Sequence, residues 1–194
     1  MRRVYLLLVV CLAAPIQADG VETILTYLEE SQARFGSIAM DIWGFAELGY
    51  LEKKSAELLQ QVLVSEGFEV QTNAANLPTA FVGSFGVGKP VIGILAEFDA
   101  LPGISQSRSA TREIIEGKNA GHACGHHLFG AGSIASAIAV KRWLEGQKID
   151  GTIRLYGTPA EEGGSGKVYM VRAGIFDDVD VVLHWHPADR NSAN

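Results

Sequence analysis

The fold is decided by residues 91–99, which read Val91-Ile92-Gly93-Ile94-Leu95-Ala96-Glu97-Phe98-Asp99. A short, unbroken apolar run bounded by turn residues is typical of a strand that is buried on both faces of a sheet. The turn that precedes it, residues 86–90, contains two glycines and a proline. Two carboxylates then follow at alternate positions. The stretch therefore predicts a strand whose end carries acidic side chains.

Helical and strand-like patterns alternate on both sides of this run. Helical spacing of apolar residues predicts helices at 19–45, 52–65, 127–144 and 167–173, and β-type runs predict further strands at 68–72, 79–85, 152–156 and 179–183. The polar, aperiodic stretch 103–119 predicts a surface loop, either a connection or a flap beside a site. This alternation predicts an α/β fold, a three-layer sandwich in which a mostly parallel mixed sheet is covered by helices on both faces.

Composition limits the classes of partner. The chain has 194 residues, of which 47% are hydrophobic and 20% charged, as expected for a globular chain with one core. The formal net charge is −6, and no basic stripe is available for a phosphate backbone. We therefore expect no nucleic-acid partner.

The N-terminus has the pattern of a secretory signal. Two arginines are followed by an apolar run over residues 4–14 and by the small residue Ala18. The run is shorter than the about 20 apolar residues that span a bilayer. We predict a signal peptide at 1–18, a secreted or periplasmic location, and no membrane association after cleavage. The alternatives are an uncleaved amphipathic anchor and a wrongly assigned start.

Removal of that signal would leave Cys124 as the single cysteine of the chain. One thiol forms no internal disulfide, so it must be buried and inert, paired with another chain, or functional.

All five histidines fall in two clusters, at 122–127 and at 184–186. Cys124 and His126 stand two residues apart, and thiolate and imidazole are the ligands that zinc favours. Gly125 between them permits a tight backbone. Alone this is a weak signal, because a buried cysteine beside a solvated histidine would look the same.

Three further groups follow predicted strands. Of the pair Glu161 and Glu162, one can bind a metal while the other acts as general base on a metal-activated water; the alternative is a solvated acidic pair at a helix start. His184 and His186 share one face of an extended strand, so either could reach the same site. Asp99 could accept a hydrogen bond from a ligand imidazole and fix its tautomer, or merely cap a loop.

The coincidence of these groups is the main evidence. Residues compatible with metal binding follow several separate strands, and cysteine and histidine are almost absent elsewhere after residue 18. The sequence thus predicts a metal site at one edge of the sheet.

At this point the sequence resembles the dinuclear-zinc peptidase and amidohydrolase family that includes aminoacylases, carboxypeptidases and plant auxin-conjugate hydrolases. Within it, the likeness is to amidohydrolases of the aminobenzoyl-glutamate hydrolase type. The motifs that carry it are residues 42–50, 98–102, 120–127, 161–162 and 185–187.

The resemblance implies roles for individual residues. It implies Cys124, His126 and Glu162 as ligands of two divalent ions, zinc or manganese, with Glu161 as general base. In the family pattern a further ligand stands six residues after an acidic residue, here Asp180, which favours His186; His184 is the alternative.

Two residues depart from the family pattern. His127 stands where many relatives have Asp, and Glu97 stands where other branches carry Asp or His.

The resemblance also implies a function. The expected reaction is hydrolysis of the amide bond of an N-acyl amino acid, an aminobenzoyl-glutamate-like conjugate or a dipeptide, so the expected partner is a small-molecule substrate. Full-length relatives are expected to be homodimers and carry a lid or dimerisation domain and a further histidine ligand, so we expect 19–194 to be the N-terminal part of the catalytic domain. The alternatives are a metal-binding or partner-binding unit without catalysis, and a redox or nucleophilic role for Cys124.

Overall fold

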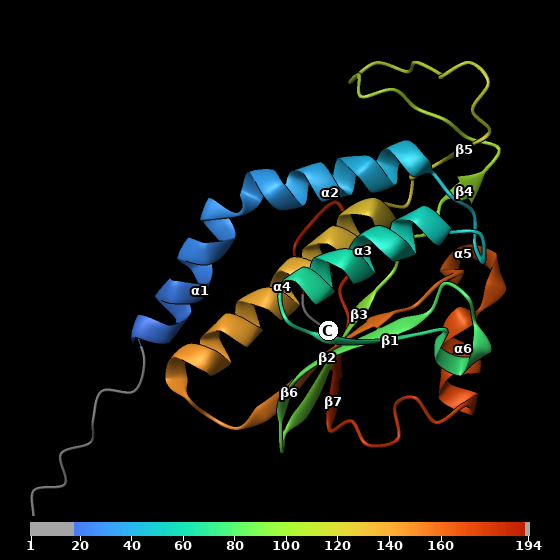
Figure 1. Cartoon of the computed structure of the whole chain (residues 1–194). Helices are drawn as coiled ribbons and strands as arrows, with labels where there is room; N and C mark the ends of the chain where they lie inside the picture. The colour runs from blue at the N-terminus through green and yellow to red at the C-terminus, as the bar shows by residue number, and fades with distance from the viewer. Residues whose placement is uncertain (1–17, 193–194) are drawn as a thin grey trace, which may run out of the picture.

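A five-stranded sheet with the strand order β1-β2-β6-β3-β7 forms the centre of the computed structural model, which describes residues 18–192 (Figure 1). Its strands are β1 (Glu69–Thr72), β2 (Phe81–Val87), β6 (Gly151–Gly157), β3 (Val91–Ala96) and β7 (Val181–Leu183). β3 has the bounds predicted from the apolar run.

The sheet is mixed, as predicted. β3 pairs in parallel with β6 and with β7, whereas β2 runs antiparallel to both β1 and β6. The carboxyl ends of β6, β3 and β7 therefore lie side by side at one edge. The segments that follow these strands and carry predicted metal ligands therefore all begin at this edge.

Helices cover the sheet. They are α1 (Ala18–Glu30), α2 (Gln32–Phe45), α3 (Lys53–Ser65), α4 (His126–Gln147), α5 (Glu161–Gly164), α6 (Gly166–Arg172) and the short 3-10 helix η1 (Ala74–Asn76). The helix predicted at 19–45 is interrupted at Ser31 and forms α1 and α2. The predictions for α3, α4 and α6 are confirmed, whereas α5 and η1 were not predicted.

Two apolar clusters join these layers. On one face, residues of α2, α3 and α4 such as Ile42, Leu59 and Ile134 pack with Leu155 of β6. On the other, Met170 of α6 packs with a second cluster on the sheet. Figure 1 shows the long helices on one side of the sheet and α6 on the other. Each fully buried aliphatic side chain contributes about 1.5–3 kcal/mol, so both layers are held mainly by apolar burial.

The loop of residues 103–119 projects from the body of the molecule (Figure 1) and contains no helix or strand, as predicted. It connects β4 (Leu101–Pro102) to β5 (Ala120–Gly121), which pair with each other.

None of the helices within residues 18–192 is long and apolar enough to cross a membrane. The predicted signal peptide lies almost wholly outside the described residues, and the division of the chain at residue 18 stays a prediction.

Candidate metal centre

Four segments bring the predicted site residues together at the carboxyl edge of the sheet. Residues 97–99 follow β3, 124–126 lead into α4, 161–162 follow β6, and 184–186 follow β7. The site is thus made by neighbouring strands of one sheet and by the start of the helix packed on them, as is usual for α/β folds.

The first group of donors is Cys124, His126 and His186. The Nε2 atom of His186 lies 3.3 Å from Cys124 Sγ and 3.4 Å from His126 Nε2. One thiol and two imidazole nitrogens therefore face a common point.

A second group shares His126. Its Nε2 atom lies 3.0 Å from Glu97 Oε2 and 3.9 Å from Glu161 Oε2. In both groups all donor atoms lie within 4.8 Å of one another. His126 is the residue common to the two groups.

Asp99 orients this shared histidine. Its Oδ1 lies 2.8 Å from His126 Nδ1, and its Oδ2 accepts the backbone N–H of Glu162 at 2.9 Å. A proton held on Nδ1 by the carboxylate leaves the Nε2 lone pair free to face both groups of donors. The geometry is the one expected for Asp99 from the sequence, although its catalytic contribution stays a prediction.

The turn that presents Glu161 and Glu162 is strained. Ala160, immediately before them, has a φ of 56°, in the left-handed region that costs an ordinary residue about 1–2 kcal/mol. Its N–H donates to the buried carboxylate of Glu52 at 2.8 Å, and Glu52 also accepts a hydrogen bond from Thr79. Glu52 therefore holds the turn in place; it was not predicted as a site residue.

Two glycines let the segment after β7 approach α4. Gly125 has a φ of +93°, and a Cβ atom there would lie 3.0 Å from Pro187. A Cβ on Gly132 would lie 2.8 Å from the ring of Trp185, whose Nε1–H donates to Ser133 Oγ at 3.0 Å. This packing places His186 above the first turn of α4.

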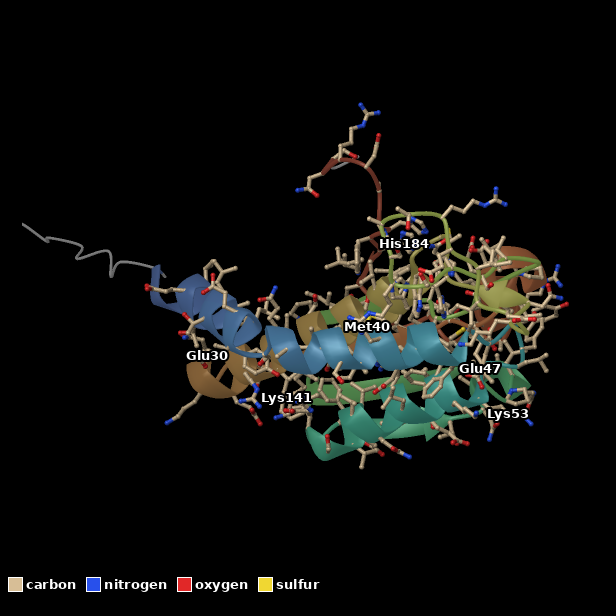
Figure 2. All side chains as sticks on the ribbon, turned by 90° about the horizontal axis from the view of Figure 1, so that it is seen from above. Glu30, Met40, Glu47, Lys53, Lys141 and His184 are labelled. Carbon is tan, nitrogen blue, oxygen red and sulfur yellow. The ribbon has the colours of Figure 1, made fainter. Side chains whose placement is uncertain are left out.

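His184 points elsewhere. Its Nε2 lies 3.3 Å from Glu97 Oε1, the oxygen that also pairs with Lys167 of α6. Figure 2 shows His184 where the last described residues rise away from the helices. The geometry favours His186 over His184 as the ligand, in agreement with the choice made from the sequence, but the assignment stays a prediction.

The ionisable groups of the site influence one another strongly. Burial alone would lower the pKa of His126, but its contacts with Asp99 and Glu97 raise it to about 10. Burial raises the pKa of the Cys124 thiol to about 11, and the nearby Glu162 and Glu161 contribute. Burial alone would raise the pKa of Glu97, whereas His126 and Lys167 lower it to about 2. The carboxylates gathered around His126 and Cys124 thus favour a positive charge in the site.

The donor set fits divalent cations. Zinc bonds nitrogen and sulfur at about 2.0–2.3 Å, so two donors of one ion lie less than about 4.6 Å apart. The 3.3 and 3.4 Å separations around His186 Nε2 meet this limit. Glu162 Oε1 is buried and has no hydrogen-bond partner within residues 18–192, and a cation would satisfy this carboxylate oxygen. Bound metal would also favour the thiolate of Cys124 over the thiol.

The structure gathers all the predicted site residues at this edge: Asp99, Cys124, His126, Glu161, Glu162 and His186. Sequence reasoning did not assign Glu97 or Lys167 to the site. The alternation of Glu97 with Asp99 after β3 was the available signal for the first. No local signal distinguishes Lys167 from a solvated lysine.

Comparison with known proteins gives consistent matches. Residues 93–193, more than half of the chain, match the model of peptidase family M20/M25/M40. The chain is 51% identical over 162 residues to a subunit of the p-aminobenzoyl-glutamate hydrolase of Escherichia coli, covering 82% of this chain and 34% of that protein. It is 33% identical to human Xaa-Arg dipeptidase, covering 86% of this chain and 38% of the relative. The chain therefore spans little more than a third of the length of these relatives.

Among solved structures, the YXEP protein of Bacillus subtilis is similar, with a TM-score of 0.71 and 25% identity. The match covers 82% of this chain and 44% of that one. It is described as a dinuclear metal-binding peptidase. The α/β fold predicted from the sequence is thereby confirmed.

Proposed function

Because the chain belongs to peptidase family M20/M25/M40, we propose that its metal centre hydrolyses the amide bonds of small-molecule substrates. The observation that carries the proposal is the convergence of two donor groups on His126 at the carboxyl edge of the sheet. The substrate class is an N-acyl amino acid, an aminobenzoyl-glutamate-like conjugate or a dipeptide. The names of the E. coli and human relatives support this class.

Two divalent cations would be held by Cys124, His126, Glu162 and His186, with Glu97 close enough to take part. The thiol and imidazole donors favour zinc, while the carboxylates also suit manganese. When bound, such a metal pair supplies Lewis acidity that brings the pKa of water from 15.7 toward about 7 and polarises a carbonyl.

Glu161 is the proposed general base. Its side chain is 44% exposed, and its Oε2 lies 3.9 Å from His126 Nε2, so it borders the donor groups and remains open to substrate. It would take a proton from the attacking water at its carboxylate and deliver it to the leaving amine nitrogen. Asp99 would keep His126 in the required tautomer throughout.

The test is Glu161→Gln, made in the full protein. A general base contributes about 10²–10⁴ in rate, so we expect kcat to fall by that factor while the metal content stays the same. Hydrolysis of p-aminobenzoyl-glutamate, N-acetyl-glutamate and a dipeptide would be followed beside elemental analysis. Glu57→Gln, an exposed residue of α3, is the matched control. Normal turnover by Glu161→Gln would remove this residue from the mechanism.

The same assays address the alternative functions. Bound metal without hydrolysis of any of these substrates would favour a metal-binding or partner-binding unit without catalysis. Loss of metal on Cys124→Ser, with no inhibition by thiol reagents, would count against a redox or nucleophilic role for this cysteine.

Location and assembly are part of the proposal. The signal-like pattern at residues 1–18 supports a secreted or periplasmic protein. The E. coli relative is named as a subunit, which supports an assembled enzyme, and we propose a homodimer. Mass measurement of the secreted protein would test both statements.

A further inference from the structure

A pocket of about 550 Å³ lies between the C-terminal turn of α2 and the loop of residues 103–119. Gly121, His122 and Ala123 form part of its lining, so it adjoins the segment that carries Cys124. Its volume is within the about 300–1,000 Å³ of typical small-molecule sites. The pocket contributes none of the donors of the metal centre.

One wall is aromatic. The half-buried indole of Trp43 packs edge-on against His127, with ring centroids 4.9 Å apart. The ring of His122 follows, with its centroid 5.2 Å from that of His127. A planar group bound against Trp43 would therefore extend an existing cluster of aromatic rings.

His122 contributes an unused acceptor. The residue is only 4% exposed, and its Nε2–H donates to the carbonyl oxygen of Ile42 at 3.1 Å. Its Nδ1 must then be an acceptor, and this buried atom has no hydrogen-bond partner among the described residues. Leaving a buried polar atom unpaired costs about 1–3 kcal/mol, so a ligand that donates a hydrogen bond here gains affinity.

The opposite wall belongs to the loop. Ile104, Arg112 and Ile114 line it, and Arg112 forms no ion pair or hydrogen bond within residues 18–192. A guanidinium group stacks well on an aromatic face. The pocket thus offers an indole on one side and a free guanidinium with aliphatic groups on the other.

The loop is held by its own hydrogen bonds. The backbone N–H of Ser107 donates to the carbonyl oxygen of Glu113 at 2.9 Å, and Ser105 exchanges hydrogen bonds with Ile115. Lys118 Nζ donates to the carbonyl oxygen of Gly44 at 2.6 Å, which ties the loop to the end of α2. The wall that faces Trp43 is therefore present before any ligand binds.

We propose that this pocket is the acyl subsite of the enzyme and takes an aromatic acyl group bearing a hydrogen-bond donor, such as a ring amine or hydroxyl. The ring lies between Trp43 and Arg112, and its donor pairs with Nδ1 of His122. This inference rests on the proposed function, since it assigns the part of the amide substrate that the pocket selects.

The test compares two substrates with the same leaving group, p-aminobenzoyl-glutamate and N-acetyl-glutamate, in the full protein. Trp43→Leu should lower kcat/KM about tenfold for the aromatic substrate, since 1.4 kcal/mol corresponds to a factor of ten, and less than twofold for the acetyl one. Arg112→Ala should cost the aromatic substrate about threefold. Arg108→Ala, an exposed arginine of the same loop outside the pocket lining, is the control.

A second variant distinguishes a loss of selectivity from structural damage caused by Trp43→Leu. Ile114→Ser changes a loop residue that is 71% exposed and leaves the contact between Trp43 and His127 intact. It should reduce selectivity for the aromatic substrate in the same direction. Equal losses on both substrates, or no loss on either, would overturn the subsite while leaving the proposed function in place.

Failure of the proposed function gives a different result. If the protein hydrolyses neither substrate, calorimetric binding of p-aminobenzoate to the wild type, Trp43→Leu and Arg112→Ala decides the question. Weaker binding by both variants would support the pocket as an aromatic site without the hydrolase function. Binding that is absent, or is independent of both residues, would overturn it.

Discussion

The residues of the metal centre form a buried half and an open half. Glu97, Asp99 and His126 are each no more than 1% exposed, whereas His186 is exposed and the side chain of Glu161 is 44% exposed. The buried half directly follows β3, which has a strand on each side, and includes the first turn of α4. The open half follows the ends of β6 and β7.

The difference reflects how each half is supported. β7 pairs through only three residues, and among the described strands it pairs with β3 alone. Beyond β7, His186 depends on Trp185 lying over Gly132 and on Pro187 against Gly125. Asp99, by contrast, is held by hydrogen bonds to two elements. Buried donors on central elements should therefore dominate metal affinity, and the following changes test that expectation in order of decreasing effect.

His126→Ala should have the largest effect, because His126 belongs to both donor groups. We expect both metals to be lost, with Kd raised by more than the about 10–100-fold typical of residues that merely support a ligand. Elemental analysis and calorimetric titration would measure this. The control is His127→Asn, since His127 is buried beside it but belongs to neither group. A similar loss in the control would attribute the effect to packing.

His186→Ala should come next, because it removes a donor from one group only. We expect the stoichiometry to fall from two metals toward one, with the affected Kd raised by about 100-fold. His184→Ala is the matched comparison, and we expect it to change Kd less than threefold, since His184 belongs to neither donor group and contacts the Glu97 oxygen that Lys167 also holds. If the two variants behave in the opposite way, His184 is the ligand.

Much of the fold could be predicted from the sequence because its signals are local. The apolar run of β3 and the apolar face of α3 lie within single segments and are read from spacing alone. The break at Ser31 was missed because the apolar spacing continues weakly across it. The pair β4 and β5 was missed because two residues on each side of a long loop carry no periodicity.

The residues of the candidate site also divide into those with a local signal in the sequence and those without one. Cys124, His126 and His186 could be found because cysteine and histidine are rare in this chain and cluster at a helix start and a strand end. Glu52 and Lys167 could not, because each acts on a residue far away in sequence: Glu52 on Ala160 and Lys167 on Glu97. Glutamate and lysine are common on surfaces, so only the tertiary structure separates these two from solvated ones.

Asp99→Asn should have an intermediate effect on the buried half. An amide can accept one of the two hydrogen bonds now made by the Asp99 carboxylate, but its NH2 group cannot accept the other. Either the tautomer of His126 or the position of Glu162 is then less well fixed, and we expect Kd for both metals to rise about tenfold. Asp41→Asn, an exposed residue of α2, controls for the change of charge. An unchanged Kd would mean that burial alone orients His126.

Lys167→Met should have the smallest effect on metal affinity, and the informative result is whether the affinity rises or falls. Lys167 pairs with Glu97, is 28% exposed on its side chain, and places a positive charge near the cation donors. Its removal ends a repulsion toward bound metal but loosens Glu97. His184 still contacts the same Glu97 oxygen at 3.3 Å, so part of the orientation remains. Lys167 is partly exposed whereas Glu97 is buried, so solvent and salt screen the lysine charge only in part. We therefore expect metal to bind about threefold more tightly, by a margin that shrinks at about 1 M salt, where the Debye length is about 3 Å.

Lys167→Arg, which keeps the charge, should bind as the wild type does. Weaker binding by Lys167→Met would show instead that the lysine supports the buried half by holding Glu97 in place.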